Sequence, residues 1–293
     1  MAGEPTCTLA LDAKCNLGES PVWDDRTGTV YFVDINENTI HAFRPEDGTH
    51  QKIVMSEHVA TIVPTSDPKI LLAALSRDIV EVDVAKEDMR FNDGKVSPQG
   101  VLVVGRMHSK WRDGKAGRLY RLDPGSSELV EVMGPSEVHL PNGIAWDEGK
   151  GIIYYIDSGA ETVVAYKADG QGLPVRGPDG KLQGRTLVTV NSGHATVPDG
   201  MTIDTDGNLW VALGESGCVV CYSAETGEEL RRVRLPVQRP TACTFGGPEL
   251  QHLYVTTRVE SGEGASPHHG GLFQVDIPGV RGVAPAYIFP LAS

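Results

Sequence analysis

Long apolar runs are missing from this sequence, and no segment approaches the roughly 18 to 20 continuous apolar residues of a membrane-spanning helix. The amino-terminal stretch from Met1 to Cys15 carries charged residues and a proline where a secretory signal peptide has its apolar core. The five cysteines are odd in number and scattered, which is not the pattern of a disulfide framework. These absences predict a cytoplasmic protein that does not enter a membrane.

Basic residues are in short supply: 26 Lys and Arg stand against 39 Asp and Glu, a formal net charge of −13. A chain this acidic repels phosphate backbones, so we expect no nucleic-acid partner. The sequence also has neither a glycine-rich phosphate-binding loop nor a Gly-x-Ser-x-Gly elbow. It therefore gives no support to nucleotide binding or to serine-hydrolase chemistry.

Cysteine and histidine metal sites are not indicated either. Cys218 and Cys221 have the spacing of a zinc or redox pair, but they lie in an alternating apolar run. Residues three apart in a strand point to opposite faces, so we expect two small buried side chains. His268 and His269 lie in a loop rich in Gly, Ser and Pro, and two adjacent residues do not easily chelate one ion.

Glycine and proline, by contrast, are plentiful, with 34 and 19 residues, which favours short strands joined by tight turns. One phrase recurs: an apolar pair, an acidic turn with glycine, and a strand of aromatic and β-branched residues. The clear copies are 22–34, 145–157 and 202–212, and the weaker ones are 94–105, 244–257 and 60–74, the last without the glycine. Each copy is typical of a β-hairpin.

Six hairpins, about 35 to 55 residues apart, match the blade length of a β-propeller. The stretches between the copies supply further strands. We therefore predict an all-β, six-bladed β-propeller with four antiparallel strands in each blade. Residues 1–293 form a single domain in this prediction, because no linker or low-complexity segment interrupts the pattern.

Four polar loops occupy the same position in four of the predicted blades, just before the innermost strand. They are Gly18-Glu19-Ser20-Pro21, Arg90-Phe91-Asn92-Asp93-Gly94, Leu140-Pro141-Asn142-Gly143 and Val197-Pro198-Asp199-Gly200. Each one alone is typical of a turn. Because the same position recurs in four blades, we expect Glu19, Asn142 and Asp199 to converge at one mouth of the central channel.

Two carboxylates and an amide oxygen form an oxygen-only set of ligands that leaves room for water or substrate. Such a set favours Ca²⁺, Mg²⁺ or Mn²⁺, and Zn²⁺ is compatible but less natural without His or Cys. A cation there could polarise a carbonyl while a carboxylate takes a proton from water, which is the chemistry of ester or lactone hydrolysis. We expect Arg90 and Asn92 on the rim as hydrogen-bond donors.

These residues also carry a family resemblance. The motifs are Leu17-Gly-Glu-Ser-Pro-Val-Trp23, Arg90-Phe-Asn-Asp-Gly-Lys95, Pro141-Asn-Gly143, Pro198-Asp-Gly-Met201, Phe245-Gly-Gly247 and Leu253-Tyr-Val-Thr-Thr257. In this order, from about residue 15 to residue 257, the chain resembles the regucalcin (senescence marker protein)/gluconolactonase/luciferin-regenerating enzyme family. The resemblance implies a six-bladed propeller with one catalytic divalent metal ion.

It also implies roles for single residues. Glu19, Asn142 and Asp199 would be the metal ligands, with Asp199 also the general base, and Arg90 and Asn92 would contact substrate. The chain departs from the family in two places. Arg106 stands where the family commonly has a threonine, and Asp113 occupies a shorter loop where the regucalcin branch has a substrate-binding glutamate.

The two departures bear on specificity, and Arg106 near the pocket would favour an anionic substrate. We therefore predict a lactonase that depends on one divalent cation, Ca²⁺ ahead of Mg²⁺, Mn²⁺ and Zn²⁺, and acts on a small-molecule lactone. As an assembly we expect a monomer or a weak homo-oligomer. Two alternatives remain open at this stage: a calcium-binding regulatory or scaffold propeller without turnover, and phosphotriester hydrolysis at the same metal site.

Overall fold

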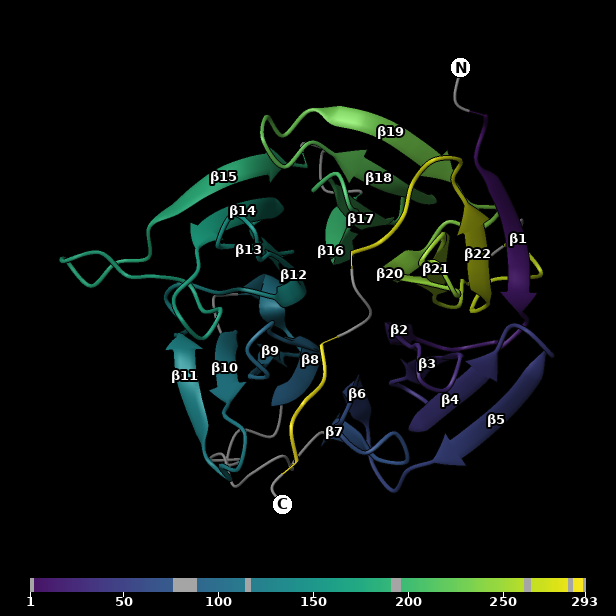
Figure 1. Ribbon diagram of the computed structural model, residues 1–293, viewed down its shortest axis with the longest axis horizontal. Helices are drawn as coiled ribbons and strands as arrows, with labels where there is room; N and C mark the ends of the chain where they lie inside the picture. Colours follow the sequence, from purple (N-terminus) through teal and green to yellow (C-terminus); the bar gives the residue numbers. More distant parts are fainter. Residues whose placement is uncertain are drawn as a thin grey trace.

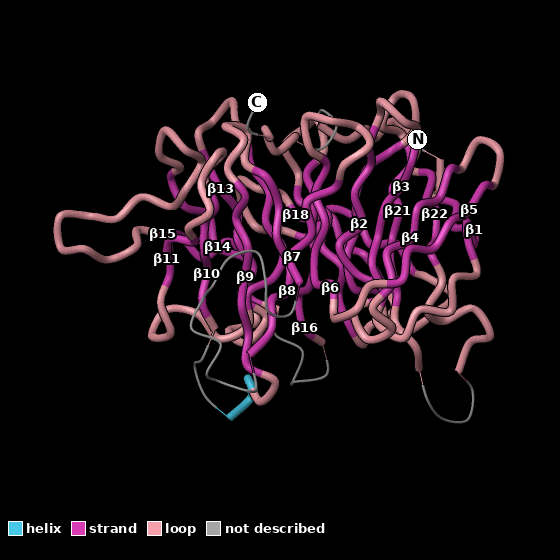
Figure 2. Tube along the Cα trace, turned by 90° about the horizontal axis from the view of Figure 1, so that it is seen from below, coloured by secondary structure: helices cyan, strands magenta, loops and turns pink. Residues whose placement is uncertain are grey.

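The computed structural model describes residues 3–75, 89–113, 117–190, 196–260, 265–283 and 287–291. Their strands form antiparallel sheets arranged around a central axis (Figure 1), which is the arrangement of a β-propeller. Figure 2 shows the same ring from the side, with a short helix (cyan) beyond one end of it. No helix in these ranges is long and apolar enough to span a membrane.

Five of the sheets are four-stranded blades. The first contains β2 (Gly18–Asp24), β3 (Thr29–Asp34), β4 (Thr39–Arg44) and β5 (Thr49–Val54). The next contains β8 (Met89–Val96), β9 (Leu102–His108), β10 (Arg118–Leu122) and β11 (Leu129–Met133), with the short 3₁₀ helix η1 (Trp111–Asp113) between its middle strands. The third contains β12 (Pro141–Asp147), β13 (Ile152–Asp157), β14 (Thr162–Lys167) and β15 (Gly184–Thr189).

The last two blades complete the ring. One contains β16 (Val197–Ile203), β17 (Leu209–Gly214), β18 (Cys218–Tyr222) and β19 (Glu229–Arg234). The other contains β20 (Pro240–Gly246), β21 (His252–Thr257), β22 (Leu272–Asp276) and β1 (Thr6–Leu11). Because β1 pairs with β22, the amino-terminal strand completes the last blade and joins the two ends of the chain.

The prediction of six four-stranded blades is wrong: the described residues form five. The predicted hairpin at 60–74 forms only a two-stranded sheet of β6 (Val59–Pro64) and β7 (Leu71–Leu75). Residues 76–88, which follow it, lie outside the described residues. The recurring phrase specifies one hairpin, and a second pair of strands has to come from sequence that lacks the phrase. The number of copies of the phrase therefore equals the number of hairpins and not the number of complete blades.

The innermost strands of the sheets nonetheless form a closed ring around the channel. Neighbours in this ring contact one another in the order β2, β6, β8, β12, β16, β20 and back to β2. The two-stranded sheet thus supplies an innermost strand like the others. Any residue that points inward from these six strands lies in or beside the channel.

The hydrophobic core lies between neighbouring sheets. Middle strands such as β17 and β18 are buried at every position, whereas outer strands such as β5 are mostly exposed. Strands that are covered on both faces need apolar residues on both, so their sequences do not alternate. Cys218 packs into the cluster on one side of β18 and Cys221 into the cluster on the other. The prediction that these two cysteines point to opposite faces is confirmed.

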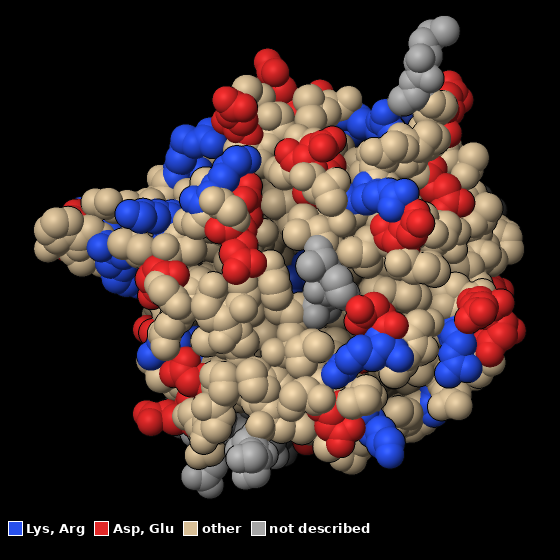
Figure 3. Space-filling view, in the orientation of Figure 1, with Lys and Arg blue, Asp and Glu red and all other residues tan. Residues whose placement is uncertain are grey.

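Two described stretches follow β22, residues 277–283 and 287–291, and each contacts an innermost strand of the ring. Phe289 pairs with Thr65 beside β6, and Gly282 pairs with Asp204 beside β16. On the face seen in Figure 3, acidic and basic side chains are interspersed around the rim. No continuous basic surface is visible among the described residues of this face.

Candidate active site

A cavity of about 210 Å³ lies at the end of the channel that carries η1. Its lining includes all five residues that the sequence places first: Glu19, Arg90, Asn92, Asn142 and Asp199. They come from β2, β8, β12 and β16, four different sheets. The structure therefore brings together residues that are as many as 180 positions apart in the sequence, counting from Glu19 to Asp199.

A β-bulge in each innermost strand aims these side chains into the cavity. The strand register shifts between Phe91 and Gly94 in β8, between Pro141 and Ile144 in β12, and between Pro198 and Met201 in β16. Asn92, Asn142 and Asp199 each occupy the first position of such a bulge. A bulge inserts an extra residue into one strand, bends it and redirects a side chain, often next to an active site.

Glu19 enters the cavity by a related route. The register of β2 shifts between Glu19 and Val22, and Ser20 within the bulge has φ of 48°. A serine rarely adopts this left-handed backbone, and two contacts stabilise it here. Its Oγ lies 2.6 Å from Oγ1 of Thr61 and accepts the backbone N–H of Ile62 at 3.2 Å. These bonds fasten the bulge of β2 to the neighbouring strand β6.

The glycines after the site residues have a different role from the predicted one. The sequence predicts turns at Asn142-Gly143 and Asp199-Gly200, but both pairs lie inside strands. A Cβ on Gly143 would lie 2.7 Å from the carbonyl oxygen of Asp199, and one on Gly200 would lie 2.4 Å from Cβ of Ala242. Glycine is needed because neighbouring innermost strands approach closely at the bulges.

Three of the five residues are joined by hydrogen bonds across the cavity wall. Nη1 of Arg90 donates to Oδ1 of Asn92 at 2.7 Å, and Nδ2 of Asn92 donates to Oδ1 of Asn142 at 3.2 Å. Nδ2 of Asn142 in turn donates to Oγ of Ser158 at 2.8 Å. These contacts hold the two amides against each other and leave the carboxylates of Glu19 and Asp199 on the remaining side of the site.

Both carboxyl groups are destabilised in their ionised form. Burial, then the charges of Asp199 and Asp93, raise the pKa of Glu19 well above its ordinary value, against a hydrogen bond from the Ser20 amide and the charge of Arg90. Burial, then the charge of Asp93, raise the pKa of Asp199 to about 8, against Arg258 and Arg90. Asp199 keeps some accessible surface, but that surface faces the cavity. Buried carboxylates that repel one another favour a cation between them.

The chemistry of the donor set fits a hard divalent cation. Glu19 and Asp199 offer carboxylate oxygens, and Asn142 offers an amide oxygen, which are the ligands that Ca²⁺ and Mg²⁺ prefer. In the described ranges no group of three or more His, Cys, Asp and Glu side chains could hold a metal ion. The lining of this cavity includes no His or Cys among the described residues, so Glu19, Asn142 and Asp199 offer a cation oxygen ligands only.

Several cavity residues escaped the sequence analysis. Arg112 and Trp111 line the cavity from η1, with the guanidinium carbon of Arg112 4.2 Å from the centre of the Trp111 ring. Arg239 pairs with Glu215 at 2.8 Å. Nε of Arg258 is buried without a hydrogen-bond partner in the described part of the chain. In the sequence, Arg258 could have been noticed only because it directly follows the family motif that ends at residue 257.

Two of the predicted residues are not in the cavity wall. Arg106 is buried beside Tyr120, since its neighbour Met107 takes the cavity-facing position of β9 and successive side chains of a strand alternate. Asp113 is exposed at the end of η1 and does not line the cavity. The expected roles of Arg106 and Asp113 in substrate selection stay predictions, and Arg112 lines the cavity from η1.

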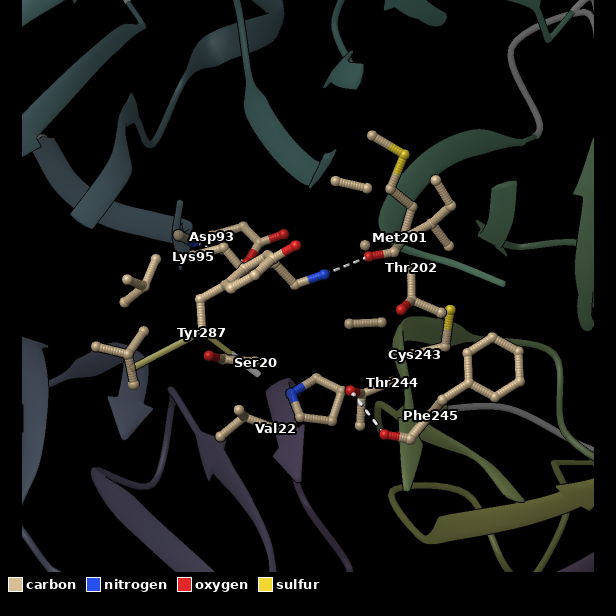
Figure 4. A pocket seen from close by; sticks show the side chains of 18 of the residues that line it. Ser20, Val22, Asp93, Lys95, Met201, Thr202, Cys243, Thr244, Phe245 and Tyr287 are labelled. Carbon is tan, nitrogen blue, oxygen red and sulfur yellow. Dashed lines mark hydrogen bonds between the residues drawn. The ribbon is translucent and has the colours of Figure 1, made fainter. Parts of the chain in front are cut away.

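A second cavity, of about 90 Å³, lies at the opposite end of the channel (Figure 4). Asp93 and Lys95 line it, and Val283 and Tyr287 border it from the carboxyl-terminal segment. Nζ of Lys95 donates to the carbonyl oxygens of Met201 at 2.7 Å and Ile144 at 3.1 Å. Burial raises the pKa of Asp93 and lowers the pKa of Lys95, and each charge partly offsets the shift of the other.

The family of SMP-30/gluconolactonase/LRE-like regions matches residues 17–259. Regucalcin of Xenopus laevis is 31% identical over 289 residues, which cover 92% of this chain and 93% of that protein. Pentonolactonase XacC of Haloferax volcanii is 33% identical over 290 residues, which cover 93% and 94%. A solved luciferin-regenerating enzyme superimposes with a TM-score of 0.85 at 28% identity, over 97% of this chain and 99% of that one. On this evidence the chain belongs to the SMP-30/gluconolactonase/LRE-like family.

Proposed function

We propose that this protein hydrolyses small lactones at a divalent cation held by Glu19, Asn142 and Asp199. The observation that carries the proposal is the convergence of these three side chains, from three separate innermost strands, in one cavity that also contains Arg90 and Asn92. Two relatives support the choice of reaction by name, the pentonolactonase above and a putative sugar lactone lactonase of Bacillus subtilis, 32% identical over 285 residues.

The cation, when bound, would polarise the ring carbonyl and acidify the attacking water. The chain supplies the remaining functions. Asp199 accepts the proton of the water as its oxygen adds to the carbonyl carbon, and later returns a proton to the ring oxygen as the ring C–O bond breaks. The product is an open-chain hydroxy acid, and one water is consumed for each lactone that is hydrolysed.

Arg90 and Arg258 line the same cavity as Asp199, and their positive charges lower its pKa. Guanidinium groups at this position can stabilise the negative charge that develops on the carbonyl oxygen, or bind the carboxylate of the product. Asn92 lines the same cavity, but its amide nitrogen already donates two hydrogen bonds within the wall. The two guanidinium groups are therefore the donors that would orient a polyhydroxylated ring, which fits a sugar lactone better than an aliphatic one.

The proposal is tested with protein stripped of metal by a chelator and then supplied separately with Ca²⁺, Mg²⁺, Mn²⁺ or Zn²⁺. Hydrolysis is followed by acid release on a panel of aldonolactones and aliphatic lactones, with Ca²⁺ expected to restore the highest rate. Asp199→Ala should abolish turnover. Asp179→Asn, which changes an exposed carboxylate in a distant turn, is the matched control and should have no effect.

The same experiment separates the lactonase from the two alternatives. A calcium-binding scaffold would bind a cation without turning over any lactone, and that result would overturn the proposal. A phosphotriester added to the panel tests the remaining alternative, since a hard cation also polarises a P=O bond. Faster turnover of the phosphotriester than of every lactone would reassign the site.

A further inference from the structure

A head-to-tail chain of hydrogen bonds runs along the wall of the cavity from Arg90 to the backbone of Pro198. Its first three bonds join Arg90 to Asn92, Asn92 to Asn142 and Asn142 to Ser158. The fourth runs from the hydroxyl of Ser158 to the carbonyl oxygen of Pro198 at 2.5 Å. Pro198 directly precedes Asp199, so the chain begins at a substrate-facing arginine and ends beside a carboxylate of the site.

The two ends of this chain fix the direction of every bond in it. A guanidinium can only donate hydrogen bonds, and a backbone carbonyl oxygen can only accept them. The single proton of Ser158 is used on Pro198, so toward Asn142 its oxygen presents a lone pair. Asn142 must therefore point its amide nitrogen at Ser158. The oxygen Oδ1 of Asn142 is left facing Asn92 and the cavity, as a cation ligand has to.

We propose that Ser158 is a positioning residue that holds the amide oxygen of Asn142 toward the cation. The inference rests on the proposed function, because it concerns the same cation site. Ser158 follows β13, is 1% exposed, and is anchored by its backbone N–H to the carbonyl oxygen of Leu140 at 3.0 Å. Asn142 is 4% exposed, so water cannot readily replace the bond that orients it.

The amide of Asn142 needs this partner because its two ends are almost equal in shape and opposite in polarity. Without the hydroxyl of Ser158, the amide nitrogen loses its acceptor, and a flipped amide would present N–H groups to the cation. Groups that orient metal ligands in this way typically account for about 10-fold to 100-fold in metal affinity. Ser158, together with the Asn92 amide that donates to Oδ1 from the other side, thus keeps an oxygen and not a pair of hydrogens toward the cation.

The test is the dissociation constant for Ca²⁺ of the metal-stripped full-length protein, measured by isothermal titration calorimetry. Ser158→Ala should weaken binding by about 10-fold or more. The matched control is Ser97→Ala, which removes another buried hydroxyl, bonded to the carbonyl oxygen of Gln171 at 3.0 Å and outside both cavities. Ser97→Ala should lower the melting temperature comparably and leave the calcium affinity unchanged.

A double variant distinguishes a positioning role of Ser158 from a general loss of structure at the site. In Asn142→Asp both atoms facing Ser158 and the cavity are oxygens, so the orientation of the group no longer matters. Adding Ser158→Ala to Asn142→Asp should then change the calcium affinity by less than about twofold. An equal loss of affinity in both backgrounds would overturn the role of Ser158, and so would an unchanged affinity in Ser158→Ala alone.

The two proposals fail in different ways. If the wild-type protein binds none of Ca²⁺, Mg²⁺, Mn²⁺ and Zn²⁺, the proposed function is overturned and the role of Ser158 falls with it. If the wild-type protein binds Ca²⁺ and Ser158→Ala binds it equally well, only the role of Ser158 is overturned. The result we expect is weakened calcium binding in Ser158→Ala, with a melting temperature lowered no more than in Ser97→Ala.

Discussion

The two ends of the channel are built by the same innermost strands but have opposite chemical character. At the η1 end the cavity is lined by carboxylates, amides and four arginines, Arg90, Arg112, Arg239 and Arg258. At the other end most of the lining is apolar or small, with Asp93 and Lys95 as its charged side chains, and the carboxyl-terminal segment borders it. Consecutive residues serve opposite ends: Glu19 and Asn92 face the first cavity, and Ser20 and Asp93 face the second.

This difference shows what the bulges accomplish. A regular strand crossing the ring would send alternate side chains into the two neighbouring sheets. A bulge rotates the strand locally, so two adjacent side chains both enter the channel and point toward opposite ends. Four bulged strands at one level therefore create a polar cluster at one end and leave the other end free to be packed. The comparison predicts that substitutions at the two ends have very different consequences.

The largest effect is expected for Asp199. Asp199→Asn keeps the shape of the side chain but removes its charge and its basicity, and should lower kcat for a lactone by about 10³-fold. Thr244→Val makes a comparable isosteric change in the opposite cavity and should leave kcat within about twofold of wild type. The measurement is steady-state hydrolysis at saturating cation. Equal losses in the two variants would erase the distinction between the two ends.

Arg90→Lys should have the next largest effect, about 10-fold to 100-fold on kcat/KM. The guanidinium of Arg90 donates from one nitrogen to both Asn92 and the carbonyl oxygen of Phe91 at 2.8 Å, and an ammonium cannot reproduce this planar geometry. Lys95→Arg is the corresponding exchange at the other end. A kcat/KM for Arg90→Lys within twofold of wild type would show that charge alone is needed at this position.

The close approach of the innermost strands predicts a stability effect for Gly143. Gly143→Ala places a Cβ 2.7 Å from the carbonyl oxygen of Asp199 and 2.8 Å from the amide nitrogen of Met201. Backbone atoms cannot move aside cheaply, so the free energy of unfolding should fall by about 2 kcal/mol. Gly170→Ala, where no atom lies within 4 Å of the added Cβ, is the control. Urea unfolding of both variants gives the comparison, and a neutral Gly143→Ala would refute the packing explanation.

The two ends are also coupled through charge, which gives a pH dependence in the cation-free protein. The pKa of Asp199 is raised to about 8 and that of Asp93 is raised from its ordinary value, so the folded protein retains protons that the unfolded chain has lost. Their contribution to stability is complete below pH 4 and is lost as pH rises toward 8. Calcium should reduce this loss. Asp93→Asn should also reduce it, because the charge of Asp93 raises the pKa of Asp199.

The measurement is the melting temperature of wild type and Asp93→Asn between pH 4 and pH 8, with and without Ca²⁺. Subtracting the melting temperature of one protein from that of the other at each pH cancels the contributions of titratable groups elsewhere in the molecule. A wild-type protein and a variant with parallel pH profiles in the absence of Ca²⁺ would show that Asp93 and Asp199 do not interact.

The smallest effect is expected at the rim. Arg112 is exposed and stacks on Trp111, so Arg112→Ala should raise KM about threefold through weaker binding of substrate and leave kcat unchanged. The salt dependence of KM should weaken in the same variant. Asp113→Ala, one residue further and outside the cavity wall, should change neither constant. A larger effect of Asp113→Ala would support the role that the sequence assigned to it.

The sequence predicted the all-β propeller and the main site residues because both depend on local patterns. A hairpin phrase specifies which residues pair, and its repetition specifies a ring. Polar residues at the same position of several repeats then converge, whatever the details of the connections. The side-chain direction of Arg106 depends on the alternation set by the pairing of β9 with β8, and Met107 is the neighbour that lines the cavity. The sixth four-stranded blade was predicted wrongly because the phrase says nothing of how many strands follow.

The propeller class, the family and the five candidate residues at the centre of the site can all be inferred from the sequence. They follow from short-range chemistry: which residues favour strands, which favour tight backbone, and which can bind a cation. The bulges at Asn142-Gly143 and Asp199-Gly200 cannot be inferred from it, since glycine is required there by a strand from another blade. The same holds for Ser158, Arg112 and Arg258 at the cavity. Ser158 bonds to a neighbouring blade and the two arginines line the cavity from distant parts of the chain, which no local pattern connects.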